Sequence, residues 1–140
     1  YGDMCGGYSV LKDIYKTTVN ELCEWRNKNN VLCSLGPSGE VIPERIITKP
    51  PTAELRPNQK DEDSLPPYPL LDKILKGFIE NEMSISSLVK EGYDHNIVKG
   101  IWRLLRNSEY KRRQSPVGVR ISKKGFGRDR RYPITSSWTR

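Results

Sequence analysis

Apolar residues recur every three or four positions in the first part of the chain, which is the spacing of one face of a helix. The members of this pattern are Leu11, Ile14, Tyr15, Thr18, Leu22 and Trp25. Asn29 and Asn30 follow the pattern and are expected to end the helix. After a turn expected at residues 36–39, Pro43 stands at the first position of one short predicted helical turn.

Three further apolar stripes predict helices in the second half of the chain. The stripe over residues 70–79 is broad and is typical of a helix with one buried face. Ser84 is placed to cap the next helix, which Gly92 is expected to end. Asp94 is placed to cap the longest pattern, over residues 97–105.

A long loop and an irregular tail are expected around these helices. Five prolines interrupt residues 48–67, and no apolar period exists there. Loops of about twenty residues in compact domains are usually functional or disordered, and we expect this one to be functional and mobile. The tail at 116–140 is expected to hold turns, an extended segment at 119–122 and many basic residues. The residues alone therefore predict an α-rich, mainly helical chain.

Composition adds two expectations about partners. Apolar residues make up 35% of the 140 residues, whereas about 45–50% counting glycine is usual for a self-contained globule. Some apolar surface is therefore expected to be buried against parts outside this chain, and Trp25, Trp102 and Trp138 are interpreted as core or interface residues. The net charge of +7, concentrated from Lys99 onward, favours an anionic partner such as a nucleotide, a nucleic acid or a membrane surface.

The cysteines and the histidine exclude several kinds of site. Cys5, Cys23 and Cys33 have neither the spacing of a zinc site nor that of a disulfide framework. We therefore expect no metal ligands and a reducing, cytoplasmic location. His95 has no partner for general-base chemistry and is expected on the surface in a first helical turn. No apolar run reaches the roughly eighteen residues that cross a bilayer.

Six segments, taken in order, resemble the NAD synthetase family, and in particular its longer, glutamine-dependent type. They are YGD at 1–3, DIYKT at 13–17, PERIITKPPTAEL at 43–55, DEDSLPPY at 61–68, EYKRRQ at 109–114 and FGRDRRYPI at 126–134. The glutamine-dependent subtype rests chiefly on the last segment. The resemblance implies that residues 1–140 form the C-terminal portion of the synthetase domain. The implied fold is an α-rich part of an α/β domain of the Rossmann-like, adenine nucleotide alpha hydrolase-like type.

The resemblance also implies a reaction. In this family ATP, as its magnesium complex, adenylates the nicotinate carboxylate of deamido-NAD, and ammonia then displaces AMP to give NAD. In the longer enzymes a separate glutaminase domain supplies the ammonia from glutamine. The family's active sites form at a subunit interface, so a homo-oligomer is expected, with no nucleic acid or membrane as partner.

The resemblance assigns binding roles to five residues and a catalytic role to none. Lys16 and Thr52 match positions that contact ATP, while Lys111, Tyr110 and Asp3 match positions near deamido-NAD. Shorter, ammonia-dependent relatives carry His where this chain has Tyr110, so Lys111 is the more specific match. Gly7 rather than Asp3 aligns with the substrate-contacting aspartate of those shorter enzymes.

Each of these residues also has a simpler interpretation. Lys16 and Lys111 are also consistent with solvated helix lysines, and a basic residue suits a helix C-terminus. Thr52 and Asp3 are also consistent with turn residues that bond the backbone nearby. The acidic cluster at 61–63 has the composition of a metal site, but a solvated loop exit is the favoured interpretation.

The Ser-Gly-Gly-x-Asp-Ser phosphate loop that defines the family does not occur in this sequence. The chain by itself is therefore expected to be inactive and to bind no cofactor, and its first residue, Tyr1, is interpreted as a point inside a longer protein. Two other functions are compatible with the composition. A basic nucleic-acid-binding module would use the charged tail with Phe126 and Tyr132, and an oligomerisation segment would use the tail to join subunits.

Overall fold

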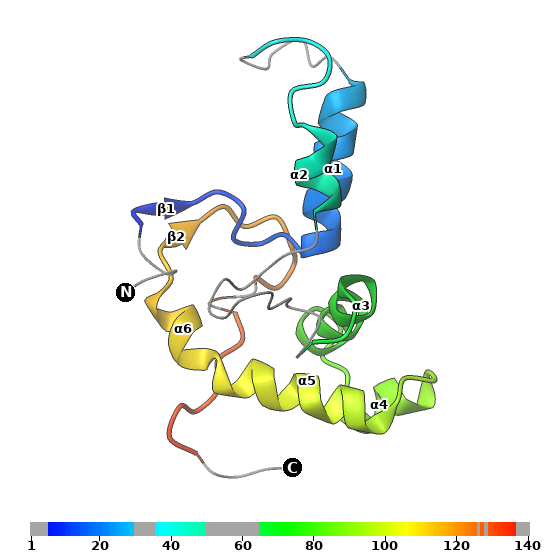
Figure 1. Ribbon diagram of the computed structural model, residues 1–140. Helices are drawn as coiled ribbons and strands as arrows, with labels where there is room; N and C mark the ends of the chain where they lie inside the picture. Colours follow the sequence, from blue (N-terminus) through cyan, green and yellow to red (C-terminus); the bar gives the residue numbers. More distant parts are fainter. Residues whose placement is uncertain (1–5, 30–35, 50–64, 126, 128, 137–140) are drawn as a thin grey trace, which may run out of the picture. The chain divides into compact units, whose positions relative to one another are not determined.

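The computed structural model describes residues 6–29, 36–49, 65–125, 127 and 129–136, which form six helices and two short strands (Figure 1). These residues divide into two compact units, and each is described by itself. The smaller unit covers residues 15–69 and the larger one joins residues 1–14 to residues 70–140.

The smaller unit holds α1 (Lys16–Lys28) and α2 (Glu44–Thr48). Asn27 joins the two segments, because its side-chain oxygen accepts hydrogen bonds from the backbone N–H groups of Val41 and Ile42 and its amide nitrogen donates to the carbonyl of Ile42. Neither helix has a buried residue. Apolar side chains such as Leu22, Trp25 and Ile46 are 44%, 50% and 67% exposed. Their burial against parts outside this chain stays a prediction.

The larger unit is built from four helices and a pair of two-residue strands. In chain order these are β1 (Tyr8–Ser9), α3 (Tyr68–Ile79), α4 (Ile85–Lys90), α5 (His95–Asn107), α6 (Glu109–Gln114) and β2 (Val117–Gly118). The first two residues of α3 belong to the smaller unit. None of the helices in the described part of the chain has the length and apolarity to span a lipid bilayer.

The core of the larger unit lies among α3, α4 and α5. Its buried apolar residues are Leu71, Ile74, Phe78, Ile79, Leu88, Val98, Ile101 and Leu105. Burial of each such side chain stabilises the fold by roughly 1.5–3 kcal/mol. The stripe predicted over residues 70–79 is confirmed, because its members face this core.

The sequence identifies both ends of α4 and the start of α5. Ser84 accepts a hydrogen bond from the Ser87 N–H at 3.1 Å, and Asp94 accepts from the N–H groups of Asn96 and Ile97 at 2.9 and 3.0 Å. Gly92 follows α4 with φ +98°, which is the left-handed conformation of a Schellman cap. These predicted helix ends are confirmed, and His95 is exposed in the first turn of α5 as expected.

One predicted boundary is wrong for a tertiary reason. The helix expected from Leu11 begins at Lys16, after a turn at residues 10–13. That turn is joined to the tail, because the Asp13 carboxylate accepts the backbone N–H groups of Ile121 and Ser122 at 2.8 and 2.7 Å. The strand β2, at Val117–Gly118, directly precedes the extended segment expected at 119–122, which pairs with no strand among the described residues. The N–H groups of Ile121 and Ser122 are then not available to a strand partner.

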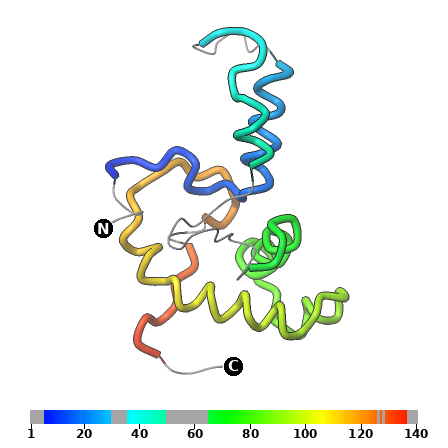
Figure 2. Tube along the Cα trace, viewed as in Figure 1, coloured from blue at the N-terminus to red at the C-terminus, as the bar shows by residue number. Residues whose placement is uncertain are grey.

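β1 and β2 pair in parallel, with Tyr8 opposite Val117 and Ser9 opposite Gly118. Figure 2 shows the orange segment that carries β2 beside the blue segment that carries β1. A Cβ atom at Gly118 would lie 2.1 Å from the carbonyl oxygen of Ser9, which is far inside van der Waals contact. Glycine is therefore required where the strands approach.

Replacing Gly118 by Ala is expected to separate β1 from β2 and to lower the free energy of unfolding by about 1–3 kcal/mol, the usual cost of forced overpacking. Gly100→Ala is the matched control. It lies inside α5 with no atom within 4 Å of its added Cβ, and it is expected to be neutral or to stabilise by up to about 1 kcal/mol. Urea unfolding of both variants measures the difference, and equal stability of the two would contradict the close approach.

The predicted α-rich class is confirmed by six helices and two short parallel strands in the described residues. Most of the loop predicted at 48–67 lies outside the described residues, as does Trp138.

Candidate functional site

The candidate site centres on α6, because it carries two of the residues predicted to contact deamido-NAD. Tyr110 is 47% exposed and Lys111 is exposed as well. Ser108 separates α6 from α5, and its hydroxyl donates to the Leu104 carbonyl at 2.7 Å. Both predicted contacts therefore lie at the surface of a helix that directly follows the core helix α5.

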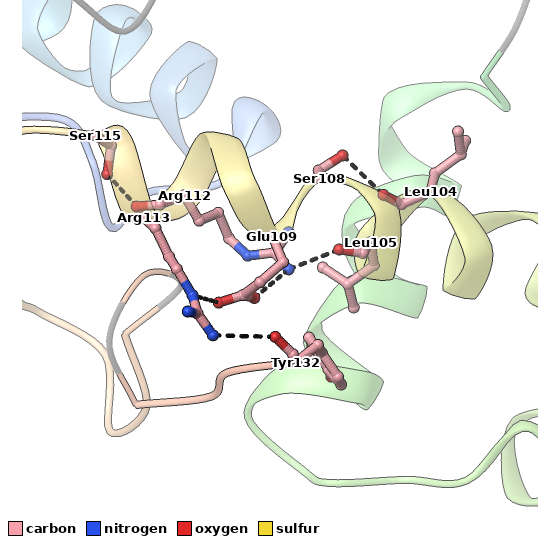
Figure 3. Close-up of polar contacts among 8 residues, drawn as sticks. All are labelled: Leu104, Leu105, Ser108, Glu109, Arg112, Arg113, Ser115 and Tyr132. Atoms are coloured by element: carbon pink, nitrogen blue, oxygen red, sulfur yellow. Dashed lines mark hydrogen bonds and ion pairs between the residues drawn. The ribbon is translucent and has the colours of Figure 1, made fainter. Parts of the chain in front are cut away.

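Glu109, the first residue of α6, is completely buried. Its carboxylate pairs with Arg112 at 2.8 Å and with Arg113 at 3.1 Å, as Figure 3 shows. The Arg112 side chain is 8% exposed and the Arg113 side chain is 46% exposed. The pair with Arg112 is thus a buried ion pair, which needs further hydrogen bonds to offset the cost of dehydration.

Those further hydrogen bonds join α6 to two other segments. The Arg112 guanidinium also donates to the Leu105 carbonyl at 2.6 Å, near the end of α5. The Arg113 guanidinium donates to the Tyr132 carbonyl at 3.2 Å, in the tail. Figure 3 shows all three side chains converging between α6, the end of α5 and the tail.

The electrostatics of Glu109 follow from this environment. Burial by itself raises the pKa of Glu109. The hydrogen bonds from Arg112 and Arg113, with the nearby backbone of Tyr132, lower it by more, so the pKa lies below the ordinary value of a glutamate. Glu109 is therefore ionised at neutral pH, and it is a structural anion rather than a proton donor.

The tail is attached to the core through aromatic and cationic groups. The Tyr132 ring meets the Trp102 ring edge-on, with centroids 5.3 Å apart, and Trp102 lies 4.9 Å from Phe78. The Arg130 guanidinium is over both the Tyr132 and the Trp102 ring and donates to the carbonyl of Phe78. Cation–π contacts of this kind contribute about 0.5–1 kcal/mol each, and more when they are dehydrated.

Asp13 and Lys12 attach the N-terminal segment to the same tail. Besides its two backbone contacts, the Asp13 carboxylate accepts the Ser122 hydroxyl at 2.7 Å. The Lys12 ammonium donates to the Pro116 carbonyl at 2.6 Å. These contacts join the segment before α1 to the tail within the larger unit.

In the smaller unit, Lys16 is the first residue of α1 and is exposed. The apolar pattern from Leu11 would place Lys16 about one turn inside the helix, whereas α1 begins only at Lys16. The first turn of α1 has no acidic residue, and the Tyr15 side chain does not cap it. Such a helix N-terminus presents backbone N–H groups and a positive dipole end, which suit an anion.

The remaining predicted site residues, Asp3 and Thr52, lie outside the described residues, as does the acidic cluster at 61–63. Among the described residues, no three His, Cys, Asp or Glu side chains gather as a metal site. The structure brings Tyr110 and Lys111 together on α6, whereas Lys16 belongs to the other unit.

A comparison with known protein families matches residues 1–115 to the family described as NAD synthase. The chain belongs to the NAD synthase family. The resemblance carried by the six sequence segments is thereby confirmed. The NAD synthase match includes Lys16, Tyr110 and Lys111, and it ends before Tyr132.

Individual NAD synthase relatives cover the tail as well. The glutamine-dependent NAD(+) synthetase of Acinetobacter baylyi is 51% identical over 138 residues, which are 99% of this chain and 24% of the relative. That of Rhodobacter capsulatus is also 51% identical over 138 residues, covering 99% of this chain and 25% of the relative. The chain thus spans about a quarter of the length of these relatives.

A solved structure of the glutamine-dependent NAD+ synthetase from Acinetobacter baumannii, in complex with ADP, is also similar. It is 42% identical in sequence with a TM-score of 0.52, and the match covers 99% of this chain and 22% of that one.

Sequence reasoning missed the residues that hold α6. Glu109 was part of a recognised segment, but no role was given to it. A signal was present, because a lone acid followed by arginines at the third and fourth positions is the spacing of helical ion pairs. No local pattern indicated that Tyr132, nineteen positions after Arg113, would meet them.

Proposed function

We propose that this chain forms part of an NAD synthetase, in which ATP drives the amidation of deamido-NAD to NAD. ATP adenylates the nicotinate carboxylate and pyrophosphate leaves. Ammonia, supplied from glutamine by another domain, then attacks the acyl-adenylate, and AMP leaves. The observation that carries the proposal is the NAD synthase family match over residues 1–115, which includes the α6 segment.

For Lys111 we propose a contact to deamido-NAD. Lys111 is exposed on a helix whose buried side is fixed by ion pairs, so its ammonium lies where a ligand can reach it. A dinucleotide carries a pyrophosphate and a carboxylate, and a lysine binds such anions as a point charge. Tyr110 is exposed beside it and offers a hydroxyl and a ring face. We propose the same ligand for Asp3.

For Lys16 we propose a contact to a phosphate of ATP, which is bound with magnesium as a substrate complex. The uncapped first turn of α1 supports this role, since backbone N–H groups and an ammonium would face the same anion. The hydroxyl of Thr52 would donate to ATP from the loop. Fixed cations and donors of this kind stabilise the charge that develops as pyrophosphate leaves.

The proposed enzyme needs residues beyond this chain. The sequence has no Ser-Gly-Gly-x-Asp-Ser phosphate loop, whose backbone donors would hold the pyrophosphate. We therefore propose that the 140 residues by themselves are inactive. The exposed apolar side chains of α1 and α2 support burial against another part of the enzyme or a second copy, in keeping with a homo-oligomer.

The test is an assay of NAD formation from deamido-NAD, ATP and either ammonium or glutamine. It uses a protein that carries this chain over the full length of its relatives, with the 140-residue chain assayed beside it. We expect NAD from the longer protein with both nitrogen sources and none from the chain alone. A folded longer protein that forms no NAD with either source would overturn the proposal, and salt-dependent nucleic-acid binding would be tested next.

A further inference from the structure

The orientation of α6 depends on contacts from outside the helix. α6 has six residues, and Ser108 at its N-cap makes no side-chain capping hydrogen bond. Isolated helices shorter than about twelve residues are marginal in water. Glu109 is the single buried residue of α6. The direction in which α6 presents Lys111 must therefore be set by the partners of its buried side.

One of these partners is a tail residue. The Tyr132 carbonyl accepts from Arg113 at 3.2 Å, and its ring lies 5.8 Å from the Arg112 guanidinium. The nearby backbone of Tyr132 also helps to lower the pKa of the Glu109 carboxyl. Tyr132 thus contacts both of the arginines that pair with Glu109 on the buried side of α6, and Figure 3 shows its hydrogen bond with Arg113.

Tyr132 is held in turn by the core. Its ring packs edge-on against Trp102 of α5, and Arg130 lies over both rings while donating to the end of α3. The Tyr132 hydroxyl is buried and has no hydrogen-bond partner among the described residues. The ring and the backbone therefore make the contacts, and the hydroxyl adds none.

The geometry of a helix links this buried side to Lys111. Glu109, Arg112 and Arg113 are at positions i, i+3 and i+4, which share one face. At about 100° per residue, Lys111 lies about 200° around the axis from Glu109. Fixing the inner face therefore fixes where Lys111 points, and a small rotation of α6 would move its ammonium away from a ligand.

We propose that Tyr132 and Arg113 form a positioning clamp that orients α6 so that Lys111 meets deamido-NAD. The inference rests on the proposed function and adds residues that act through Lys111. Tyr132 lies beyond the NAD synthase match at 1–115 but within the 138 residues shared with the glutamine-dependent relatives. The clamp thus uses a part of the chain that the family model does not cover.

The experiment compares four variants of the full-length protein that carries this chain, which are Tyr132→Ala, Tyr132→Phe, Arg113→Ala and Lys111→Ala. The KM for deamido-NAD, the KM for ATP, kcat and the melting temperature are measured for each. Tyr132→Ala and Arg113→Ala are expected to raise the KM for deamido-NAD about tenfold, since small misplacements of binding groups have effects of this order or larger. The KM for ATP should stay unchanged.

Two comparisons isolate the clamp from a general loss of structure. Tyr132→Phe keeps the ring and the backbone, so its kinetics are expected to match those of the unmodified protein. The double variant with both Tyr132→Ala and Arg113→Ala is expected to be no worse than either single variant. Tyr132→Ala removes the ring that holds the tail against Trp102, and Arg113→Ala removes the hydrogen bond to the Tyr132 carbonyl, so each change releases α6 from the same segment of the tail. Arg113 is partly exposed, so its variant decides the case if Tyr132→Ala fails to fold.

The outcomes separate the clamp from the proposed function. If Lys111→Ala leaves the KM for deamido-NAD unchanged, the proposed role of Lys111 is wrong, and the clamp with it. If Lys111→Ala raises that KM while the folded clamp variants do not, the clamp alone is overturned. If the clamp variants raise the KM for deamido-NAD and the KM for ATP equally, Tyr132 only supports the general packing of the fold, and the clamp is overturned. The clamp is also overturned if the effects of Tyr132→Ala and Arg113→Ala add up in the double variant.

Discussion

Replacing Glu109 by Ala is expected to lower the free energy of unfolding by about 3–5 kcal/mol, the usual cost of breaking a buried ion pair from one side. The variant would leave the Arg112 guanidinium, which is 8% exposed, without its carboxylate. It would also remove an acceptor of Arg113. Chemical denaturation with urea measures the change, since the midpoint shifts while the slope reports whether two-state unfolding is kept.

The matched control is Glu24→Ala on α1. Glu24 and Lys28 form an ion pair 3.5 Å apart, at the i, i+4 spacing that Glu109 and Arg113 also have. Both side chains of the Glu24–Lys28 pair are more than half exposed. Exposed helical pairs contribute about 0.3–0.5 kcal/mol, so this variant should be nearly as stable as the unmodified protein. If Glu109→Ala and Glu24→Ala lowered the free energy of unfolding equally, the buried ion pairs of Glu109 would contribute no more to stability than an exposed pair, which would contradict the prediction.

The pH dependence of stability follows from the same carboxylate. Because the pKa of Glu109 is lower in the folded state than in the unfolded chain, its contribution is fully present above the unfolded value of about 4.3. It is lost as the pH falls through the folded value. Glu109→Gln should therefore flatten the loss of stability below about pH 4.3, and an unchanged acid slope would contradict this assignment.

Replacing Lys111 by Ala is expected to lower kcat/KM for deamido-NAD about a hundredfold in the full-length protein, an effect of the size found when one positioned donor is removed. The fold should be unaffected, because Lys111 is exposed. Lys111→Arg keeps the charge and should recover part of the activity. Steady-state kinetics with deamido-NAD as the varied substrate measure the change.

Lys73→Ala is the control for this prediction, because Lys73 is an exposed lysine of α3 that belongs to no proposed site. Its kinetics should equal those of the unmodified protein. An active enzyme with an unimpaired Lys111→Ala variant would keep the synthetase function and exclude Lys111 from the site.

The helices could largely be predicted from the sequence because their signals are local. The apolar stripe of α3, the Ser84 and Asp94 caps and the glycine after α4 each act within a few residues. The apolar pattern by itself places the start of α1 too early, because residues 10–13 form a turn that Asp13 joins to residues 121 and 122.

The candidate site likewise has some residues that could be predicted from the sequence and others that could not. Lys111 and Tyr110 were found from a segment of six residues, and the structure confirms that both are exposed on a helix. Their ligand stays a prediction, as do the roles of Lys16, Thr52 and Asp3. The residues that orient α6 could not be found by local reasoning, since Tyr132 reaches Arg113 only through the fold of the tail.

The sequence by itself determined the family, the helices with their caps, and the surface residues proposed to bind ligands. These depend on residue types and spacings that act locally or recur as a motif. Only the tertiary structure decided which charges are buried and which are exposed. Glu109 and Lys111 are two positions apart on one short helix, yet one is enclosed by two arginines and the tail and the other faces outward. The reason is physical, because burial depends on segments that are distant along the chain and meet only when the chain folds.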